Sequence, residues 1–370
     1  MTVGEGRLRA DELARRSPDG GTRPEGQRRR ARRRVLRAGA RIGAVLGVVV
    51  AVVVVATWVW WWAPPSAEQE SRGVNALWAR HQWVGQAHSD REYHALADTL
   101  RQGQISDVFF HVGPLDAAGT IPPDRYVHAR ELLTAMDRLV PGVRAQAWIG
   151  QVTKQDAGPL DLKSHAVRDR IVRTAETFLD LGFDGIHYDI EPVYPADGEF
   201  LDLLDRTHDL TRGRGAVLSV SLEQLELVNG MQALAAELLP DIHYPPRPSR
   251  GFLKQVARRV DQVAIMAYDT ELPADWLVGR HFAWQAKHVT ELVGEQVSVF
   301  VGVPTYAQGQ PFPWAENLRS AIRGTRRGLD RLDHQPAHPV GLAIYADWTT
   351  TPDEWALYQA AWVHPGRQRR

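Results

Sequence analysis

Three ionisable side chains occur at every second position of the segment FDGIHYDIEP, residues 183–192, namely His187, Asp189 and Glu191. Successive side chains of a β-strand point to opposite faces, so a strand here places all three on one face. Two carboxyl groups about 6.6 Å apart along that face disfavour double ionisation, which raises the pKa of one of them. Glu191 is therefore the expected proton donor near neutral pH, and His187 is placed to hydrogen-bond Asp189. The alternative is a buried polar network that only ties strands together.

The elements that must position these side chains form a repeating pattern of strands and helices. Strand-like apolar segments occur at residues 74–78, 107–113, 144–152, 183–191, 216–224, 261–269, 297–306 and 340–348. Amphipathic helical patterns separate them, for example at residues 124–140, 167–182 and 315–332. Eight such units predict a parallel sheet closed into a (β/α)8 TIM barrel, with Glu191 at the C-terminal rim where barrel enzymes place their chemistry. An open doubly wound sheet is the alternative, but no glycine-rich phosphate loop follows the first strand candidate.

The N-terminal end of the chain is basic and leads into an apolar segment. Residues 1–41 contain 13 basic and five acidic residues, a formal charge of +8, and the remainder carries −8 because the whole chain is neutral. Residues 42–62, IGAVLGVVVAVVVVATWVWWW, are uncharged and long enough to cross a bilayer as one helix. The arginines before this segment and the tryptophans at its far end predict a single-pass anchor in the cytoplasmic membrane with a cytoplasmic N-terminus. A cleaved signal peptide is the alternative, although its apolar core normally has only about 7–15 residues.

The remaining parts of the chain follow from this anchor. We expect residues 1–41 to be a disordered cytoplasmic tail, 63–72 a linker, 73–362 a barrel outside the membrane, and 363–370 a basic C-terminal tail. No basic patch interleaved with aromatic residues indicates a nucleic-acid partner, we assign no cofactor and no metal ligand, and the sequence does not give the oligomeric state. The chain has no cysteine, which excludes a disulfide scaffold and thiolate metal sites.

The segment DGIHYDIE, Asp184 to Glu191, resembles the fourth-strand signature D-G-x-D-x-D-x-E of glycoside hydrolase family 18, the chitinase family. In that family the final Glu is the general acid, and the Asp two residues before it orients the acetamido group of the substrate, which itself attacks the anomeric carbon. The resemblance implies that Glu191 is the acid/base and Asp189 the stabilising residue of a retaining, substrate-assisted mechanism, an exception to the usual two-carboxylate route. His187, which we group with the substrate-binding residues, stands where the family has Asp or Asn.

Two later segments resemble further motifs of the same family, in the same order along the chain. AIMAYD, residues 264–269, is similar to the sixth-strand motif M-x-Y-D. This resemblance implies that Tyr268 is a catalytic residue that hydrogen-bonds the reacting acetamido oxygen, and that Asp269 lines the site. GVPTYA, residues 302–307, is similar to the seventh-strand motif G-x-P-x-Y-G, which implies that Tyr306 lines the cleft.

The resemblance is looser on the eighth and third strands. The family has a Trp beneath the reacting sugar, and GLAIYADW aligns Tyr345 with it, while Trp348 follows three residues later. These two residues have opposite parity on a strand, so only one is expected to face inward, and we assign Tyr345. The third-strand segment AWIGQ retains only Gly150 of the usual glycine-serine signature. Further candidates for contacts at the rim are Trp83, Ser221, Glu223 and Trp276.

These residues support three functional interpretations. The first is a membrane-anchored, extracytoplasmic glycoside hydrolase that acts on a glycan containing N-acetylhexosamine. The second is a catalytically inactive carbohydrate-binding protein on the same barrel, which His187 favours and which Glu191, Asp189 and Tyr268 oppose. The third is a metal-dependent hydrolase in which His187, Asp189, Glu191 and His111 supply nitrogen and oxygen ligands.

Overall fold

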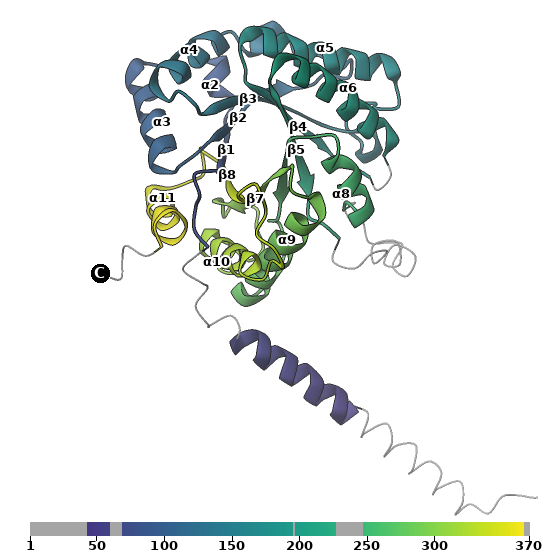
Figure 1. Cartoon of the computed structure of the whole chain (residues 1–370), viewed down its shortest axis with the longest axis vertical. Helices are drawn as coiled ribbons and strands as arrows, with labels where there is room; N and C mark the ends of the chain where they lie inside the picture. Colours follow the sequence, from purple (N-terminus) through teal and green to yellow (C-terminus); the bar gives the residue numbers. More distant parts are fainter. Residues whose placement is uncertain (1–42, 60–68, 195–196, 227–246, 366–370) are drawn as a thin grey trace, which may run out of the picture. The chain divides into compact units, whose positions relative to one another are not determined.

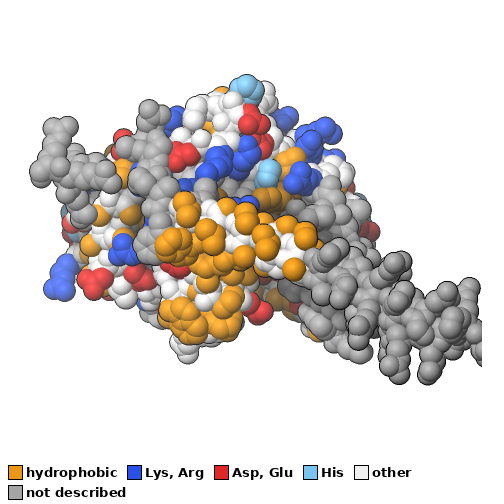
Figure 2. Space-filling view, turned by 90° about the horizontal axis from the view of Figure 1, so that it is seen from below, with side chains coloured by type: hydrophobic (Ala, Val, Ile, Leu, Met, Phe, Trp, Pro, Cys, Tyr) orange, Lys and Arg blue, Asp and Glu red, His pale blue; other side chains and the backbone are white. Residues whose placement is uncertain are grey.

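The computed structural model describes residues 43–59, 69–194, 197–226 and 247–365 (Figure 1). The chain divides into two units, Met1–Trp62 and Ala63–Arg370. In the first unit, residues 43–59 are helical, and their valine side chains are exposed and form a hydrophobic surface (Figure 2). Within the described ranges, no helix combines the length and the apolar character needed to cross a membrane. The predicted tail 1–41, residues 42 and 60–62 of the predicted anchor, most of the linker and residues 366–370 lie outside the described residues.

The second unit contains an eight-stranded parallel barrel, as the repeating pattern predicts. The strands are β1 Ala76–Ala79, β2 Asp107–Pro114, β3 Arg144–Val152, β4 Gly185–Glu191, β5 Val217–Glu223, β6 Gln262–Met266, β7 Ser298–Pro304 and β8 Gly341–Tyr345. Each strand pairs with the next. The barrel is closed by β1 and β8, in which Ala76 pairs with Ala343 and Leu77 pairs with Ile344. The prediction of a (β/α)8 TIM barrel is confirmed.

Helices surround the barrel and bury its outer face (Figure 1). They are α2 Gln82–Gly85, α3 Asp90–Gln102, η1 Pro123–Arg125, α4 Ala129–Leu139, η2 Lys154–Asp156, α5 His165–Leu181, α6 Gly198–Arg214, α8 Arg250–Ala257, α9 Asp275–Val293, α10 Leu318–Leu329, α11 Pro352–Tyr358 and the π-helical turn η3 Gln359–Val363. Local sequence explains several helix starts. The Ser164 side chain accepts a hydrogen bond from the Val167 amide at the start of α5, and Asp197 caps α6 in the same way.

The interior of the barrel is filled by a separate cluster of aromatic and alanine side chains. Its largest buried members are Trp78, Phe109, Trp148 and Phe300. These side chains form a packed floor, so the barrel is not a channel, and chemistry is confined to the rim above them.

Three strands end two or three residues earlier than the sequence pattern predicts. The strand pattern ran to residue 269 for β6, to 306 for β7 and to 348 for β8, whereas these strands end at Met266, Pro304 and Tyr345. Asp269 has a φ of 57°, in the left-handed region, so the backbone after β6 turns away from the strand direction. The residues after each strand therefore belong to rim loops.

Candidate active site

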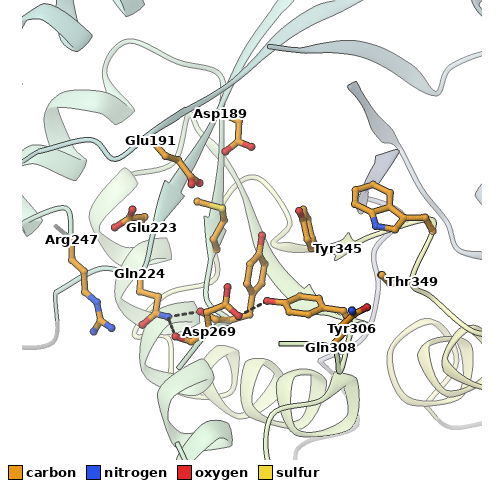
Figure 3. Close-up of a pocket in the computed structure, with 13 residues that line it drawn as sticks. Asp189, Glu191, Glu223, Gln224, Arg247, Asp269, Tyr306, Gln308, Tyr345 and Thr349 are labelled. Atoms are coloured by element: carbon orange, nitrogen blue, oxygen red, sulfur yellow. Dashed lines mark hydrogen bonds between the residues drawn. The ribbon is translucent and has the colours of Figure 1, made fainter. Parts of the chain in front are cut away.

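A cavity of about 670 Å³ lies at the C-terminal rim of the barrel (Figure 3). Strands β4, β5, β6 and β8 and the loops that follow β5 to β8 contribute its walls. Its lining consists of Asp189, Glu191, Glu223, Gln224, Arg247, Met266, Tyr268, Asp269, Tyr306, Gln308, Tyr345, Trp348 and Thr349. Six of the seven residues assigned from the sequence therefore lie together in one cavity, and the seventh, His187, does not line it. Their roles stay predictions.

His187 lies below the cavity in the barrel interior and is fully buried. Its ring stacks on Phe109 with centroids 3.7 Å apart. The indole of Trp78 can only donate, so its 3.1 Å hydrogen bond makes Nε2 of His187 an acceptor and leaves the imidazole proton on Nδ1, which meets Ser219 Oγ at 2.8 Å. Burial holds the pKa of His187 well below 6.5, so the ring is neutral.

The expected hydrogen bond from His187 to Asp189 is not formed. Nε2 of His187 instead lies 2.9 Å from the hydroxyl of Ser221, on the neighbouring strand β5. Because Nε2 is an acceptor, the Ser221 hydroxyl donates its proton to the imidazole, and this serine takes the place that the sequence analysis gave to Asp189. The sequence pattern identified the face shared by His187 and Asp189 but not the side chain from the next strand that separates them.

Asp189 is held from the side by a residue of strand β3. The indole Nε1 of Trp148 donates to Oδ2 of Asp189 at 2.9 Å, while Oδ1 is buried and has no hydrogen bond within the described residues. Gly150 pairs in register with Asp189, and a Cβ at that glycine would lie 3.1 Å from the Asp189 carbonyl oxygen and 3.5 Å from Trp148 Nε1. Gly150 thus leaves the space in which the indole and the carboxylate meet. Burial raises the pKa of Asp189, and the Trp148 hydrogen bond counteracts this rise.

Glu191 is the last residue of β4 and is half-buried in the cavity wall. Burial, followed by the negative charges of Asp189 and Glu223, raises its pKa from 4.5 to about 9. The carboxyl group therefore carries a proton at neutral pH, which is the state that a general acid requires. The expectation that one of two close carboxyl groups titrates high is met at Glu191.

Glu223 ends β5 beside Glu191 and brings a third carboxyl group into the cavity. Burial raises the pKa of Glu223 to about 7, and the positive charge of Arg247 partly offsets that rise. In Figure 3, Arg247 reaches down past Glu223 on the side away from Asp189. A neighbour with this pKa changes its charge near neutral pH, which couples Glu223 to the proton on Glu191.

The wall formed by the loops after β6 and β7 is a hydrogen-bonded unit. The Tyr306 hydroxyl donates to Oδ1 of Asp269. The backbone amides of Asp269 and Thr270 donate to the two carboxylate oxygens of the buried Glu316. Gln224 donates to the backbone carbonyl of Asp269 at 3.3 Å, from the opposite side. These contacts hold Asp269 in its left-handed conformation and keep its carboxylate at the cavity wall.

Aromatic side chains form the remaining wall. Tyr268 stacks on Tyr345 with centroids 5.3 Å apart, and the Thr305 amide donates to the Tyr345 carbonyl at 2.9 Å. Trp348 lies edge-on to Tyr345 at 5.6 Å and also lines the cavity. The prediction that only one of Tyr345 and Trp348 faces inward is wrong, because β8 ends at Tyr345 and the alternation rule does not extend to residue 348. Burial raises the pKa of Tyr268 well above 10, so its hydroxyl is a proton-bearing donor.

Several residues of this site were not assigned from the sequence. Trp148 lies two positions before Gly150 on β3, and side chains two positions apart on a strand point to the same face. The sequence could therefore have predicted that both residues lie on the face of Asp189. Met266 likewise lies two positions before Tyr268. Gln308, Thr349 and Arg247 come from irregular segments, where no periodic pattern reports which way a side chain points.

The metal-centred interpretation receives no support from the geometry. Among the described residues, no group of three or more His, Asp or Glu side chains is arranged to hold a metal ion. His111 packs edge-on against Trp148 at 4.7 Å, and burial lowers its pKa to about 4.

Comparison with solved structures shows which proteins share this barrel. The spore cortex-lytic enzyme SleL of Bacillus megaterium has a TM-score of 0.53 at 12% identity, over 81% of this chain and 76% of that one. A class V chitinase from Pseudomonas fluorescens Pf-5 has a TM-score of 0.53 at 14% identity, over 81% and 99%. A chitinase from Chromobacterium violaceum has a TM-score of 0.50 at 16% identity, over 78% and 98%. The barrel of this chain therefore has the same overall fold as the barrels of these enzymes.

Comparison of the sequence itself finds no match. No family model matches the sequence, and no curated protein matches it. The three solved structures are only 12–16% identical to this chain, so the similarity concerns the barrel, and the proposed function depends on the side chains at the rim.

Proposed function

We propose that the chain is a glycoside hydrolase that cleaves glycans containing N-acetylhexosamine by a retaining, substrate-assisted mechanism. The observation that carries this proposal is the pair of carboxyl groups at the end of β4. Glu191 is protonated at neutral pH, with a pKa of about 9, and Asp189 beside it is anchored by Trp148. Both line a cavity with aromatic walls, the type of site in which sugars bind.

The first step of the proposed reaction uses Glu191 as an acid. Its proton passes to the glycosidic oxygen as the bond from that oxygen to the anomeric carbon breaks. The acetamido carbonyl oxygen of the same sugar forms a new bond to the anomeric carbon, which gives a cyclic oxazolinium ion. Asp189 stabilises the positive charge of this ion, and its Oδ1, which has no hydrogen bond within the described residues, is the acceptor for the acetamido N–H.

The second step uses Glu191 as a base. The carboxylate left by the first step takes a proton from water, and the water oxygen attacks the anomeric carbon from the face that the leaving group vacated. The oxazolinium ring opens, which restores the acetamido group, and Glu191 carries a proton again. Two displacements give net retention of configuration. The Tyr268 hydroxyl is the proposed donor to the acetamido oxygen, and Tyr345 is the proposed floor beneath the sugar.

Hydrolysis assays with a matched pair of variants test this proposal. The full chain would be incubated with N-acetylglucosamine oligomers and with cell-wall glycan strands, alongside Glu191→Gln and the control Glu199→Gln. Glu199 lies in the first turn of α6 and does not line the cavity. The expected result is cleavage by the wild-type chain and the control and none by Glu191→Gln. Saturable binding without cleavage by all three would contradict the proposal and support the carbohydrate-binding alternative.

We also propose that residues 42–62 anchor the barrel on the outer side of the cytoplasmic membrane. The uncharged sequence, the arginines before it and the exposed valines of the 43–59 helix support this proposal. Membrane fractionation tests it, with Val50→Arg and Val53→Arg combined, because each arginine at a span centre costs about 2.5–3.5 kcal/mol. We expect the double variant to leave the membrane fraction and the control Val127→Arg, an exposed valine of the barrel, to remain. A wild-type chain recovered without membranes would contradict the anchor.

A further inference from the structure

The segment that leads into the barrel, residues 69–75, is fastened to it by hydrogen bonds. The carbonyl of Gln69 accepts a 2.6 Å hydrogen bond from Nε of Arg326 on α10. The amide of Ser71 donates to the carbonyl of Trp362 at 2.9 Å. The side chain of Asn75 is fully buried and accepts the indole N–H of Trp362 at 2.8 Å. The chain is therefore fixed to the barrel from Gln69 onward.

These fastening points lie at the end of the barrel opposite the candidate active site. Asn75 directly precedes β1, and its carbonyl accepts the amide of Ser106, which directly precedes β2. Both residues thus lie where parallel strands begin, whereas Glu191 and the cavity lie where the strands end. Helix α9 runs from one end of the barrel to the other, and its 19 residues make it about 28 Å long. The wall between the fastening points and the rim has about this height.

Few residues connect the fastening points with the proposed membrane span. The span is proposed to end at Trp62, which lies seven residues before Gln69. A fully extended chain covers at most about 3.6 Å per residue, so seven residues reach no further than about 25 Å. This reach is shorter than the wall of the barrel. A connection of this length cannot pass along the wall and bring the rim against the bilayer.

We propose that the short connection keeps the catalytic rim away from the membrane, so that the chain cleaves glycan strands beyond the membrane surface and not glycans carried on membrane lipids. This inference rests on the proposed glycosidase function and on the proposed anchor. The sugars of a lipid-linked glycan begin at the lipid headgroup, which the cavity cannot approach. A strand that extends beyond the headgroups can enter the cavity from the open side of the rim.

Energy transfer from single labelled positions to the bilayer tests the orientation. The chain has no cysteine, so one introduced cysteine carries the dye alone. Val127→Cys places the dye on the rim, in the loop between β2 and α4, and Ala337→Cys places it at the opposite end, in the loop between α10 and β8. Both residues are exposed, so neither substitution disturbs the core. With the full chain in vesicles that contain an acceptor-labelled lipid, we expect more transfer from Ala337→Cys. Equal transfer, or more transfer from Val127→Cys, would overturn the inference.

A longer connection tests the consequence for the substrate. About 30 Gly and Ser residues inserted after Ser66 add a mean reach of about 30 Å, enough to pass the wall. In dilute vesicles, we expect the wild-type chain to cleave an N-acetylglucosamine oligomer linked to a lipid of the same vesicle about tenfold more slowly than the insertion variant does, because a linker that cannot span two sites gives an effective concentration near zero. Both chains should cleave the free oligomer at the same rate. Equal cleavage of the lipid-linked oligomer by the two chains would refute the restriction.

The same measurements separate this inference from the two proposals on which it rests. No cleavage of the free oligomer would refute the glycosidase function and with it the substrate restriction, while the energy transfer would still decide the orientation. A wild-type chain that does not stay with the vesicles would refute the anchor and this inference together. Cleavage of the free oligomer by that chain would then still uphold the glycosidase function.

Discussion

The indole Nε1 of Trp148 donates a 2.9 Å hydrogen bond to Oδ2 of Asp189, from the neighbouring strand. One oxygen of the carboxylate is thereby fixed, and the other, Oδ1, stays buried and unpaired among the described residues. A carboxylate anchored in this way presents one defined acceptor to a bound ligand. Trp148 acts through Asp189 and is a positioning residue of the proposed reaction.

Replacing this indole tests the positioning role. Trp148→Phe keeps a large ring in the barrel but removes the donor, so we expect kcat to fall about tenfold to a hundredfold, the range for a hydrogen bond to a charged group. The hydrogen bond favours the ionised form of Asp189, so its loss raises the pKa of Asp189 and moves the acid limb of the kcat profile to higher pH. The matched control is Trp83→Phe, which removes an indole bond to Asp347 outside the cavity. An acid limb at the same pH in Trp148→Phe would refute the role.

The pH dependence of activity should report the proton on Glu191. Its pKa of about 9 predicts that kcat/KM falls on the basic side as this proton is lost. The negative charge of Glu223 helps to raise that pKa, so Glu223→Gln should move the basic limb to lower pH. Glu199→Gln, outside the cavity, should leave the limb in place. If the basic limb does not move in Glu223→Gln, the charge of Glu223 does not raise the pKa of Glu191.

Stability should also depend on pH through Glu191. The folded-state pKa of about 9 lies above the ordinary value of 4.5, so ionisation favours the unfolded state at any pH between these values. Glu191→Gln removes this cost. We expect it to be more stable than the wild-type chain by about 1–3 kcal/mol at pH 7, with the difference shrinking towards pH 4.5. Thermal unfolding at several pH values measures this, and a pH-independent difference would contradict the burial of Glu191.

Substitution of His187 should mainly lower the stability of the folded chain. Its ring stacks on Phe109 and accepts the indole N–H of Trp78. His187→Ala opens a cavity and leaves that buried donor unpaired, so we expect a loss of about 2–4 kcal/mol in the free energy of unfolding. His187→Asn retains polar groups and should lose less. Urea unfolding compares the two, and equal losses would show that the hydrogen bond from Trp78 contributes little.

The sequence predicts the barrel and the positions of Asp189 and Glu191 because both follow from the periodic pattern of apolar residues. Apolar strands alternating with helices require a covered parallel sheet, and alternation along β4 places Asp189 and Glu191 on the inner face. The same rule fails where the strand ends. The Ala346 amide donates a 3.1 Å hydrogen bond to the hydroxyl oxygen of Thr305, and the strand ends at Tyr345. The chain then turns, and Trp348 also lines the cavity.

Contacts between strands could not be predicted from a single segment. Ser221 separates His187 from Asp189, and Trp148 anchors Asp189, because the register of the barrel sets these residues side by side. Arg247 enters the cavity from a segment without periodicity. Such positions depend on the closure of the barrel and on loop geometry, which are properties of the whole fold.

The configuration of the first reaction product tests the central claim most directly. The claim is that Glu191 and Asp189 support attack by the acetamido group of the substrate, which requires two displacements at the anomeric carbon. Proton NMR during the first turnovers of a β-linked N-acetylglucosamine oligomer resolves the two anomers before they interconvert. The account predicts that the β-anomer forms first. Initial formation of the α-anomer would show a single displacement and would contradict it.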